Sequence, residues 1–212
     1  MPSGQDALNA MMRRLGRRTE AQLRTDCLDE LNALIDEIEN GPFFPFFLEA
    51  EDTSLVTVAS VRTVALPTDF GLEIEESAFR IKNADGDFKY PNKMSKEEID
   101  GKYLNADPDF PTAYAIFGND IYLGPTPDVV YTMALPYYKT TGALADDATN
   151  DPLWLEHAFN WVCNEAGSSV ADLVMQNQKL ADRLMLRAAK AKKALWKQHN
   201  AREHINKKYV VE

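Results

Sequence analysis

The side chains that could carry out chemistry are few and scattered along the chain. Three histidines and two cysteines are present, and they do not combine at the spacing of metal ligands. His199 and His204 are five residues apart, so a helix would turn them to different faces. The paired acids are sequence neighbours whose side chains point apart, whereas a glycosidase needs two carboxylates facing one cleft. These pairs are Glu75 with Glu76, Glu97 with Glu98, and Asp146 with Asp147.

No motif in the sequence supplies a catalytic framework. There is neither a glycine-rich phosphate loop nor a nucleophile-elbow serine. The spacing of Asn83, Asp85 and Asp87 is similar to that of a calcium loop, but the required glycine and final glutamate are missing, which favours a turn. His157 follows a helical pattern beside two tryptophans, and we expect it to pack rather than to catalyse. We therefore predict no enzyme activity, no cofactor and no metal, with a carboxylate hydrolase as the weaker alternative.

Charge is divided unevenly along the 212 residues. The formal net charge is −10, yet residues 179–208 hold ten basic residues and only two acids, so this segment is +8 and the remainder −18. Such asymmetry favours a surface that docks an acidic partner, or complementary contacts between copies of the chain. A solvated helix face is the simpler interpretation.

Cysteine usage and hydropathy indicate a reducing, aqueous setting. Cys27 and Cys163 each fall inside a helical pattern, and we expect buried free thiols. No apolar run approaches the roughly 18 to 20 residues that a membrane span needs. The first residues lack the apolar core of a signal peptide. We therefore expect no membrane contact and synthesis in the cytoplasm.

Apolar periodicity predicts two helices at the N-terminal end. The first covers residues 5–15 and ends at Gly16. Thr19 is the expected cap of the second, with Gln22 in the capping box. That helix is amphipathic over about five turns and stops at Asn40-Gly41-Pro42.

Two further helices are predicted at the C-terminal end. Asp151 and Pro152 begin a helix that extends to about Met175. Another starts near Asn177, with apolar residues on one face and most basic residues on the other. A polar, irregular surface connection is expected just before them, over residues 139–150.

The middle of the chain has the composition of β-structure. We predict strands at residues 55–66 and 129–138, and hairpins about Asp85-Gly86 and Gly118-Asn119. A short helix is expected to begin at the Ser95 capping box and to end near Gly101.

An aromatic segment, Phe43-Phe-Pro-Phe-Phe-Leu48, links the helical and β-rich parts. Burying each phenylalanine is favourable by roughly 1.5 to 3 kcal/mol. The favoured interpretation is a core plug between helix and sheet. An anchor between subunits is the alternative, because aromatic residues are enriched at interface centres.

Neither set of helices can bury its apolar stripe alone, which predicts that they pack together. The fold class is then α+β, a helical bundle formed by the N- and C-terminal helices with an inserted antiparallel β domain. We expect residues 1–48 and 149–199 to form the bundle, 49–148 the insertion, and 200–212 a C-terminal docking tail.

Several segments follow one another in a characteristic order. They are Pro42 to Leu48 after an amphipathic helix, Leu66 to Phe70, Ala113 to Asp128, Tyr131 to Lys139, Leu144 with Asp146-Asp147, and Trp154-Leu155 before a basic, alanine-rich helix. Over most of residues 20–200 this order resembles the head–tail adaptor (connector) proteins of short-tailed bacteriophages.

The resemblance implies a structural protein of the virion neck. Proteins of this family form a twelve-fold ring between the portal protein and the tail tube or nozzle, with DNA passing through the lumen. The resemblance also implies that the C-terminus, here about His199 to Glu212, reaches onto the portal. The alternative function is a nucleic-acid-binding accessory protein that uses the basic C-terminal helix for phosphate contacts.

Candidate partner-binding residues come from two places. The first group belongs to the basic C-terminal helix and tail: Lys197, Arg202, Lys207, Lys208, Tyr209 and Val210. The second group is expected to be exposed in the β domain: Asn119, Asp120, Pro125 and Pro127.

Overall fold

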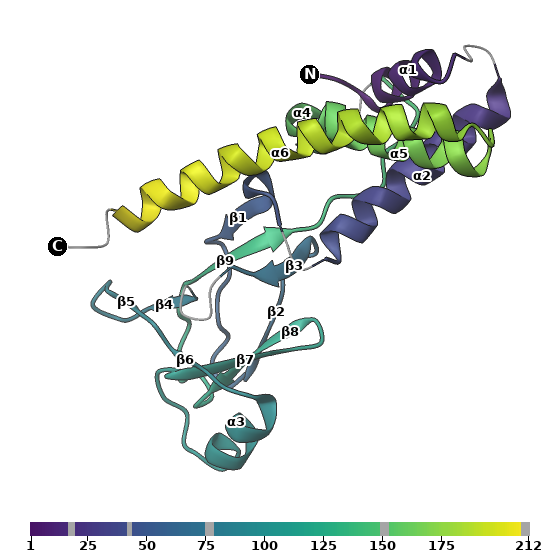
Figure 1. Ribbon diagram of the computed structural model, residues 1–212. Helices are drawn as coiled ribbons and strands as arrows, with labels where there is room; N and C mark the ends of the chain where they lie inside the picture. The colour runs from purple at the N-terminus through teal and green to yellow at the C-terminus, as the bar shows by residue number, and fades with distance from the viewer. Residues whose placement is uncertain (17–19, 42–43, 75–78, 149–152, 209–212) are drawn as a thin grey trace. The chain divides into compact units, whose positions relative to one another are not determined.

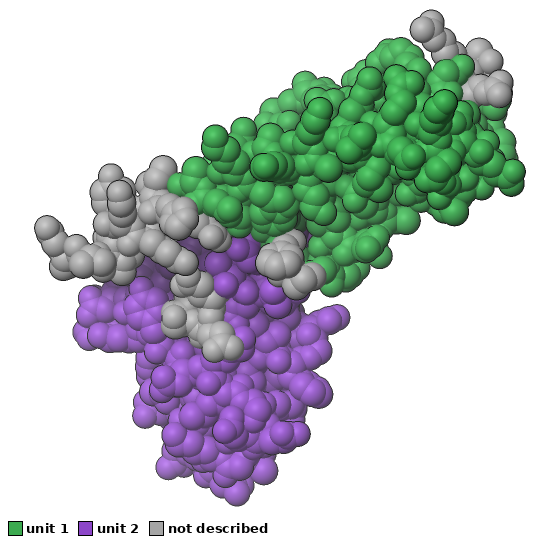
Figure 2. Space-filling model, in the orientation of Figure 1, with its two compact units in different colours: residues 1–48, 141–212 green, residues 49–140 purple. Residues whose placement is uncertain are grey.

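The chain folds into two compact units. The computed structural model describes residues 1–16, 20–41, 44–74, 79–148 and 153–208, without the side chains of 203–208. Unit 1 combines Met1–Leu48 with Thr141–Glu212, and unit 2 is the continuous segment Glu49–Thr140 (Figure 2). The predicted α+β class is confirmed, since helices at both ends of the chain enclose a β-rich middle in the sequence (Figure 1).

Unit 1 is helical. Its elements are α1 (Gly4–Arg14), α2 (Ala21–Glu39), the 3-10 helix η1 (Phe46–Leu48), α4 (Leu153–His157), α5 (Phe159–Leu173) and α6 (Gln178–Lys208). The single helix expected over residues 152–175 is divided at Ala158, whose backbone leaves the helical region with φ −124° and ψ 14°. The last helix continues past His199 to Lys208, so residues 200–208 of the expected docking tail are helical.

Local signals explain most helix ends. Ser3 caps α1 in a capping box with Asp6, and Gly16, with φ +73°, follows its end. Thr19, Asp151 and Pro152 lie outside the described residues. The capping box expected for α2 therefore stays a prediction. The described helix begins after Glu20, which makes no side-chain cap, and the Gln22 side chain donates to Asp26.

Helix α5 is the centre of unit 1. It packs against α1, α2, α4 and α6, and α6 lies alongside it (Figure 1). Its buried residues occupy most of its circumference because it has neighbours on several sides. They are Trp161, Val162, Cys163, Asn164, Ala166, Gly167, Ser168, Val170 and Ala171. Ser168 Oγ donates to the Ala181 carbonyl at 2.9 Å and ties α5 to α6.

The segment that follows unit 2 is docked on the N-terminal helices. The Asn32 side chain brackets Leu144, accepting from its amide at 2.7 Å and donating to its carbonyl at 3.2 Å. Arg24 pairs with Asp146. A Cβ on Gly4 would lie 1.9 Å from the Ala145 carbonyl oxygen, so only glycine permits this approach. Residues 141–148, expected in the insertion as a surface connection, therefore belong to unit 1.

The aromatic segment is part of the unit 1 core. Phe44, Phe46, Phe47 and Leu48 are all buried, while Pro42 and Phe43 lie outside the described residues. The Phe47 ring meets the Trp154 ring edge-on with centroids 5.1 Å apart. This packing agrees with the core plug predicted from the sequence.

Unit 2 contains two small sheets and one helix. Its elements are β1 (Glu49–Asp52), β2 (Thr63–Ala65), β3 (Phe70–Glu73), β4 (Arg80–Lys82), β5 (Phe88–Lys89), β6 (Asn92–Lys93), α3 (Lys96–Tyr103), β7 (Ala113–Phe117), β8 (Asp120–Gly124) and β9 (Met133–Lys139). One sheet has the order β1-β9-β4-β5 with β3 also on β9, and the other has the order β2-β8-β7-β6. The β6–β7 pair is parallel and the other named pairs are antiparallel.

Turn and cap signals in unit 2 are confirmed. Gly118, with φ +61°, turns β7 into β8, and β4 pairs with β5 across the Asp85-Gly86 turn. The capping box of Ser95 and Glu98 is present, and α3 ends at Tyr103, two residues later than expected. The core between the strands includes Phe79, Tyr114, Ile121, Leu123, Met133 and Leu135.

Two predicted strands are shorter than their composition suggested. Of residues 55–66 only Thr63–Ala65 forms a strand, and β9 begins at Met133 rather than at Val129. The remainder is held by isolated bridges, Val56 with Thr132 and Val58 with Val61. β-Branched residues fit a pleated surface, but their presence does not show that a neighbouring strand is available for pairing.

Glu39 is a buried carboxylate that joins three parts of unit 1. Its side chain is 6% exposed at the C-terminal end of α2. It accepts hydrogen bonds from Trp154 Nε1 at 2.6 Å, Thr141 Oγ1 at 2.7 Å and the Thr141 amide at 2.9 Å. The carboxylate thus connects α2 both to the start of the returning segment and to α4.

We predict that Glu39→Ala lowers the free energy of unfolding of unit 1 by about 2 to 4 kcal/mol, because it leaves buried donors unpaired. Glu39→Gln retains one acceptor oxygen and should cost less. Urea unfolding followed by tryptophan fluorescence measures this, since all three tryptophans lie in unit 1. Asp36→Ala, on the exposed face of the same helix, is the control, and an equal loss in that variant would contradict the prediction.

Candidate functional site

The two histidines whose side chains are described, His157 and His199, are placed in packing contacts. The His157 ring stacks on the Phe47 ring with centroids 5.0 Å apart, and His199 is buried with its ring edge-on to Trp196 at 5.1 Å. Within the described part of the chain, no group of three or more His, Cys, Asp or Glu side chains is arranged to hold a metal ion. None of the helices in that part combines the length and apolar character of a membrane span.

Cys27 and Cys163 are buried free thiols, as predicted. Burial raises the pKa of Cys27 to about 11, with a smaller contribution from Asp26. Burial likewise raises the pKa of Cys163 to about 12. Because the thiolate is the nucleophile, both side chains are held in their unreactive form at neutral pH.

We predict that iodoacetamide at pH 8 leaves both cysteines of the native protein unmodified and alkylates both in urea. The folded-state pKa values lie well above pH 8, whereas the unfolded thiols regain an ordinary pKa near 8.5. Intact-mass spectrometry before and after unfolding measures the outcome. Rapid alkylation of the native chain at either position would show that the thiol is accessible.

The C-terminal candidates lie along α6. Lys197 is exposed. Arg202 places its guanidinium 3.7 Å from the centroid of the Phe46 ring, so it is anchored to the core plug. The side chains of Lys207 and Lys208 and the whole of Tyr209 and Val210 lie outside the description, and their binding role stays a prediction.

The β-domain candidates separate into two pairs. Asn119 and Asp120 occupy the β7–β8 turn, where Asn119 is exposed and Asp120 half-buried. The expectation that Pro125 and Pro127 are exposed is wrong, because both are buried. The chain around them is held by backbone hydrogen bonds from Asp109 to Thr126 and from Ser60 to Pro127, so the corner is internal to unit 2.

The structure exposes a valine patch on unit 2 that sequence reasoning missed. Its residues belong to two neighbouring segments, 56–61 and 129–130, joined by the Thr57 hydroxyl donating to the Val129 carbonyl at 3.0 Å. The exposed fractions of its side chains range from 41% to 64%. They are Val56, Val58, Val61, Val129 and Val130. A group of exposed apolar side chains on neighbouring segments is a candidate interaction surface in a soluble protein.

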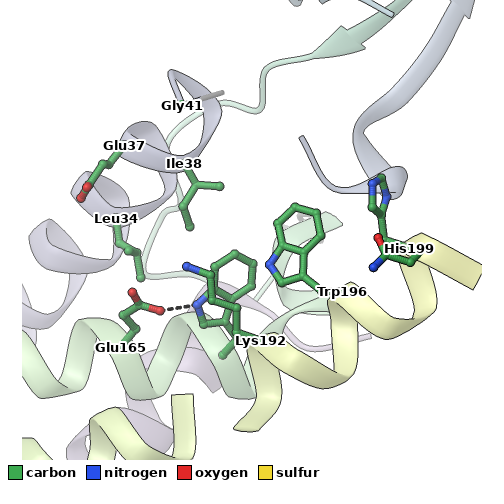
Figure 3. A pocket seen from close by; sticks show the side chains of 10 residues that line it. Leu34, Glu37, Ile38, Gly41, Glu165, Lys192, Trp196 and His199 are labelled. Atoms are coloured by element: carbon green, nitrogen blue, oxygen red, sulfur yellow. Dashed lines mark hydrogen bonds between the residues drawn. The ribbon is translucent and has the colours of Figure 1, made fainter. Parts of the chain in front are cut away.

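Unit 1 carries an aromatic groove of about 710 Å³ lined by α2, α5 and α6 (Figure 3). Leu34 and Ile38 of α2 face Trp196 of α6 across it (Figure 3). Trp161 lines the groove, and its Nε1 donates to the Glu165 carboxylate. Lys192 Nζ lies 4.9 Å from the centroid of the Trp161 ring.

Charged groups surround the aromatic groove. Glu37 and Glu165 supply carboxylates, and Lys192 supplies an ammonium group. An apolar floor with a charged rim is the anatomy of a protein-interaction surface.

Comparison with known protein families gives one match over nearly the whole chain. A family model described as SU10 adaptor protein matches residues 3–205 of the 212. The match covers all of unit 2 and the helices of unit 1 except the last three residues of α6. No curated protein matches the chain.

Proposed function

Because the chain belongs to the SU10 adaptor family of short-tailed phage head–tail adaptors, we propose that it joins the portal to the tail tube or nozzle. The observation that carries this proposal is the match over residues 3–205, which includes both units. The protein acts as a structural adaptor of the virion neck, through protein–protein contacts in an oligomeric assembly. A ring of twelve copies is the proposed form.

The architecture supports a role in assembly. Unit 1 offers the aromatic groove and a long basic helix, and unit 2 offers the valine patch. When the same contact of modest strength is repeated around a ring, the assembly binds its partner with high avidity although no single site is strong. Two separate folded units allow one chain to present different surfaces to different partners.

We propose that the C-terminal end of α6 and the residues beyond it dock on the portal. Eight exposed cations lie along α6 up to Arg202, and they favour an acidic partner. They are Lys179, Arg183, Arg187, Lys190, Lys192, Lys193, Lys197 and Arg202. Arg202 is fixed on Phe46, so the chain beyond it projects from an anchored position.

Deleting residues 203–212 should weaken binding to portal particles at least tenfold and leave unit 1 folded, because Arg202 and the core are retained. Sedimentation of portal particles with bound adaptor measures the first effect, and urea unfolding by tryptophan fluorescence measures the second. Binding as tight as that of the full chain would refute a C-terminal docking tail.

We further propose that the valine patch faces the tail component. Val58→Asp with Val130→Asp should abolish attachment of the tail tube or nozzle to adaptor-bearing portal particles, because two desolvated carboxylates are costly in an apolar interface. Portal binding should be unchanged. Val174→Asp, an exposed valine of unit 1, is the matched control. Normal tail attachment by the double variant would exclude the patch.

A nucleic-acid-binding accessory protein is the second candidate. The exposed cations of α6 favour it, since phosphate contacts need accessible Lys and Arg side chains. It requires affinity for duplex DNA that falls steeply with salt. Absence of binding at low salt would remove this candidate, whereas passive contact with DNA in a ring lumen requires no measurable affinity.

A further inference from the structure

A cationic pocket lies in unit 1 between α1, α5 and α6, away from the aromatic groove. Its volume is about 450 Å³. Three cationic side chains line it: Arg14 from the end of α1, and Arg187 and Lys190 from α6. Asn160 and Asn164 of α5 complete the polar lining.

The cationic pocket has no counter-charge of its own. Among the described residues, no Asp or Glu forms an ion pair with Arg14, Arg187 or Lys190. Arg14 Nη2 donates to Asn160 Oδ1 at 3.0 Å, while Nη1 is buried and has no hydrogen-bond partner in the described structure. Burial, together with repulsion from Arg187 and Arg13, lowers the pKa of Arg14.

This arrangement favours an oxyanion. Like charges held together and partly desolvated are costly, and an anion placed among them removes the repulsion. A carboxylate is an acceptor-only group, and guanidinium groups bind it through paired N–H donors. Two guanidinium groups and one ammonium group at one pocket are therefore suited to carboxylate side chains.

The same chain carries unpaired carboxylates on the acidic face of α2. The members of this face are Asp26, Asp29, Glu30, Asp36 and Glu37. Asp29, Asp36 and Glu37 are exposed. In the described structure none of the five forms an ion pair. Asp29 and Asp36 are seven residues apart and so project from the same side of the helix.

We propose that the cationic pocket of one copy receives carboxylates from the acidic face of α2 of a second copy. The inference rests on the proposed function, since an adaptor ring requires a repeated contact between copies. The pocket and the acidic face are different surfaces of unit 1, so the contact is head-to-tail. A head-to-tail contact of fixed rotation generates a closed ring or a filament, whereas a self-complementary one stops at a dimer.

A carboxylate is favoured over a nucleic-acid phosphate. Arg14 is half-buried among three helices, so only part of the pocket is open to a DNA backbone, whereas Lys193 and Lys197 lie on exposed α6 positions outside it. The charge distribution also favours a second copy as the partner. Residues 179–208 carry +8 and the rest −18, so the basic segment of one copy is complementary to the acidic remainder of another.

Charge reversal tests the proposal on the full-length chain. Sedimentation velocity at low salt should show self-association that weakens as salt rises, because the contact is ionic. Arg187→Glu should raise the dissociation constant at least tenfold, and so should Asp29→Lys with Asp36→Lys. The matched controls are Lys193→Glu and Asp172→Lys with Asp182→Lys, which make the same charge changes at exposed positions that line neither cavity.

Mixing the two defective variants is the sharpest test. Arg187→Glu retains the acidic face, and the Asp29→Lys, Asp36→Lys variant retains the cationic pocket. Each alone should associate at least tenfold more weakly than the wild type, and an equimolar mixture should regain association, because the intact acidic face of one variant meets the intact cationic pocket of the other. Urea unfolding by tryptophan fluorescence should show that all variants are folded.

Three results would overturn the proposal. They are a wild-type chain that stays monomeric at millimolar concentration in low salt, an Arg187→Glu chain that associates like Lys193→Glu, and loss of duplex-DNA binding in Arg187→Glu with unchanged self-association. The last result would assign the pocket to nucleic acid. Portal-particle binding is measured separately, so a failed pocket with normal portal binding leaves the proposed function standing.

Discussion

Unit 1 depends on a contact between its N-terminal part, residues 1–48, and its C-terminal part, residues 141–212, which are separated in the sequence by the whole of unit 2. Glu39 ends α2, and its carboxylate accepts from Thr141 and from Trp154, residues that follow the whole of unit 2. A buried carboxylate is tolerated only when its acceptor sites are filled. Around it, Asn32 brackets Leu144 and Phe47 meets Trp154, so polar and apolar contacts fix the same register.

Two of the surfaces suited to binding form only when the N- and C-terminal parts of unit 1 pack together. The aromatic groove requires α2 and α6 together, and the cationic pocket requires α1 and α6, although these helices come from opposite ends of the sequence. The valine patch has a different origin. Its two segments run beside each other with one isolated bridge, between Val56 and Thr132, and Val58 bridges to Val61 within its own segment.

Local signals in the sequence were sufficient for much of the fold. The Ser95 capping box, the Gly118 turn and the apolar stripes of α2 and α6 each depend on residues a few positions apart. The predictions that were wrong concern residues whose surroundings are set by parts of the chain far away in the sequence. Composition could not show that Val58 is exposed, or that Pro125 is buried. The meeting of Arg14 with Arg187 had no local signal, because their proximity arises only from packing.

The discontinuity of unit 1 also constrains its synthesis. Unit 2 is one continuous segment, Glu49–Thr140, and all of its strands are available once that segment has left the ribosome. Helices α1 and α2 are synthesised first, but they can pack into unit 1 only at the end, because α5 and α6 follow more than a hundred residues later. At about 5–20 residues per second, this interval is on the order of ten seconds. During that time the apolar stripe of α2 lacks its partner, and the newly made chain is open to premature association with its neighbours.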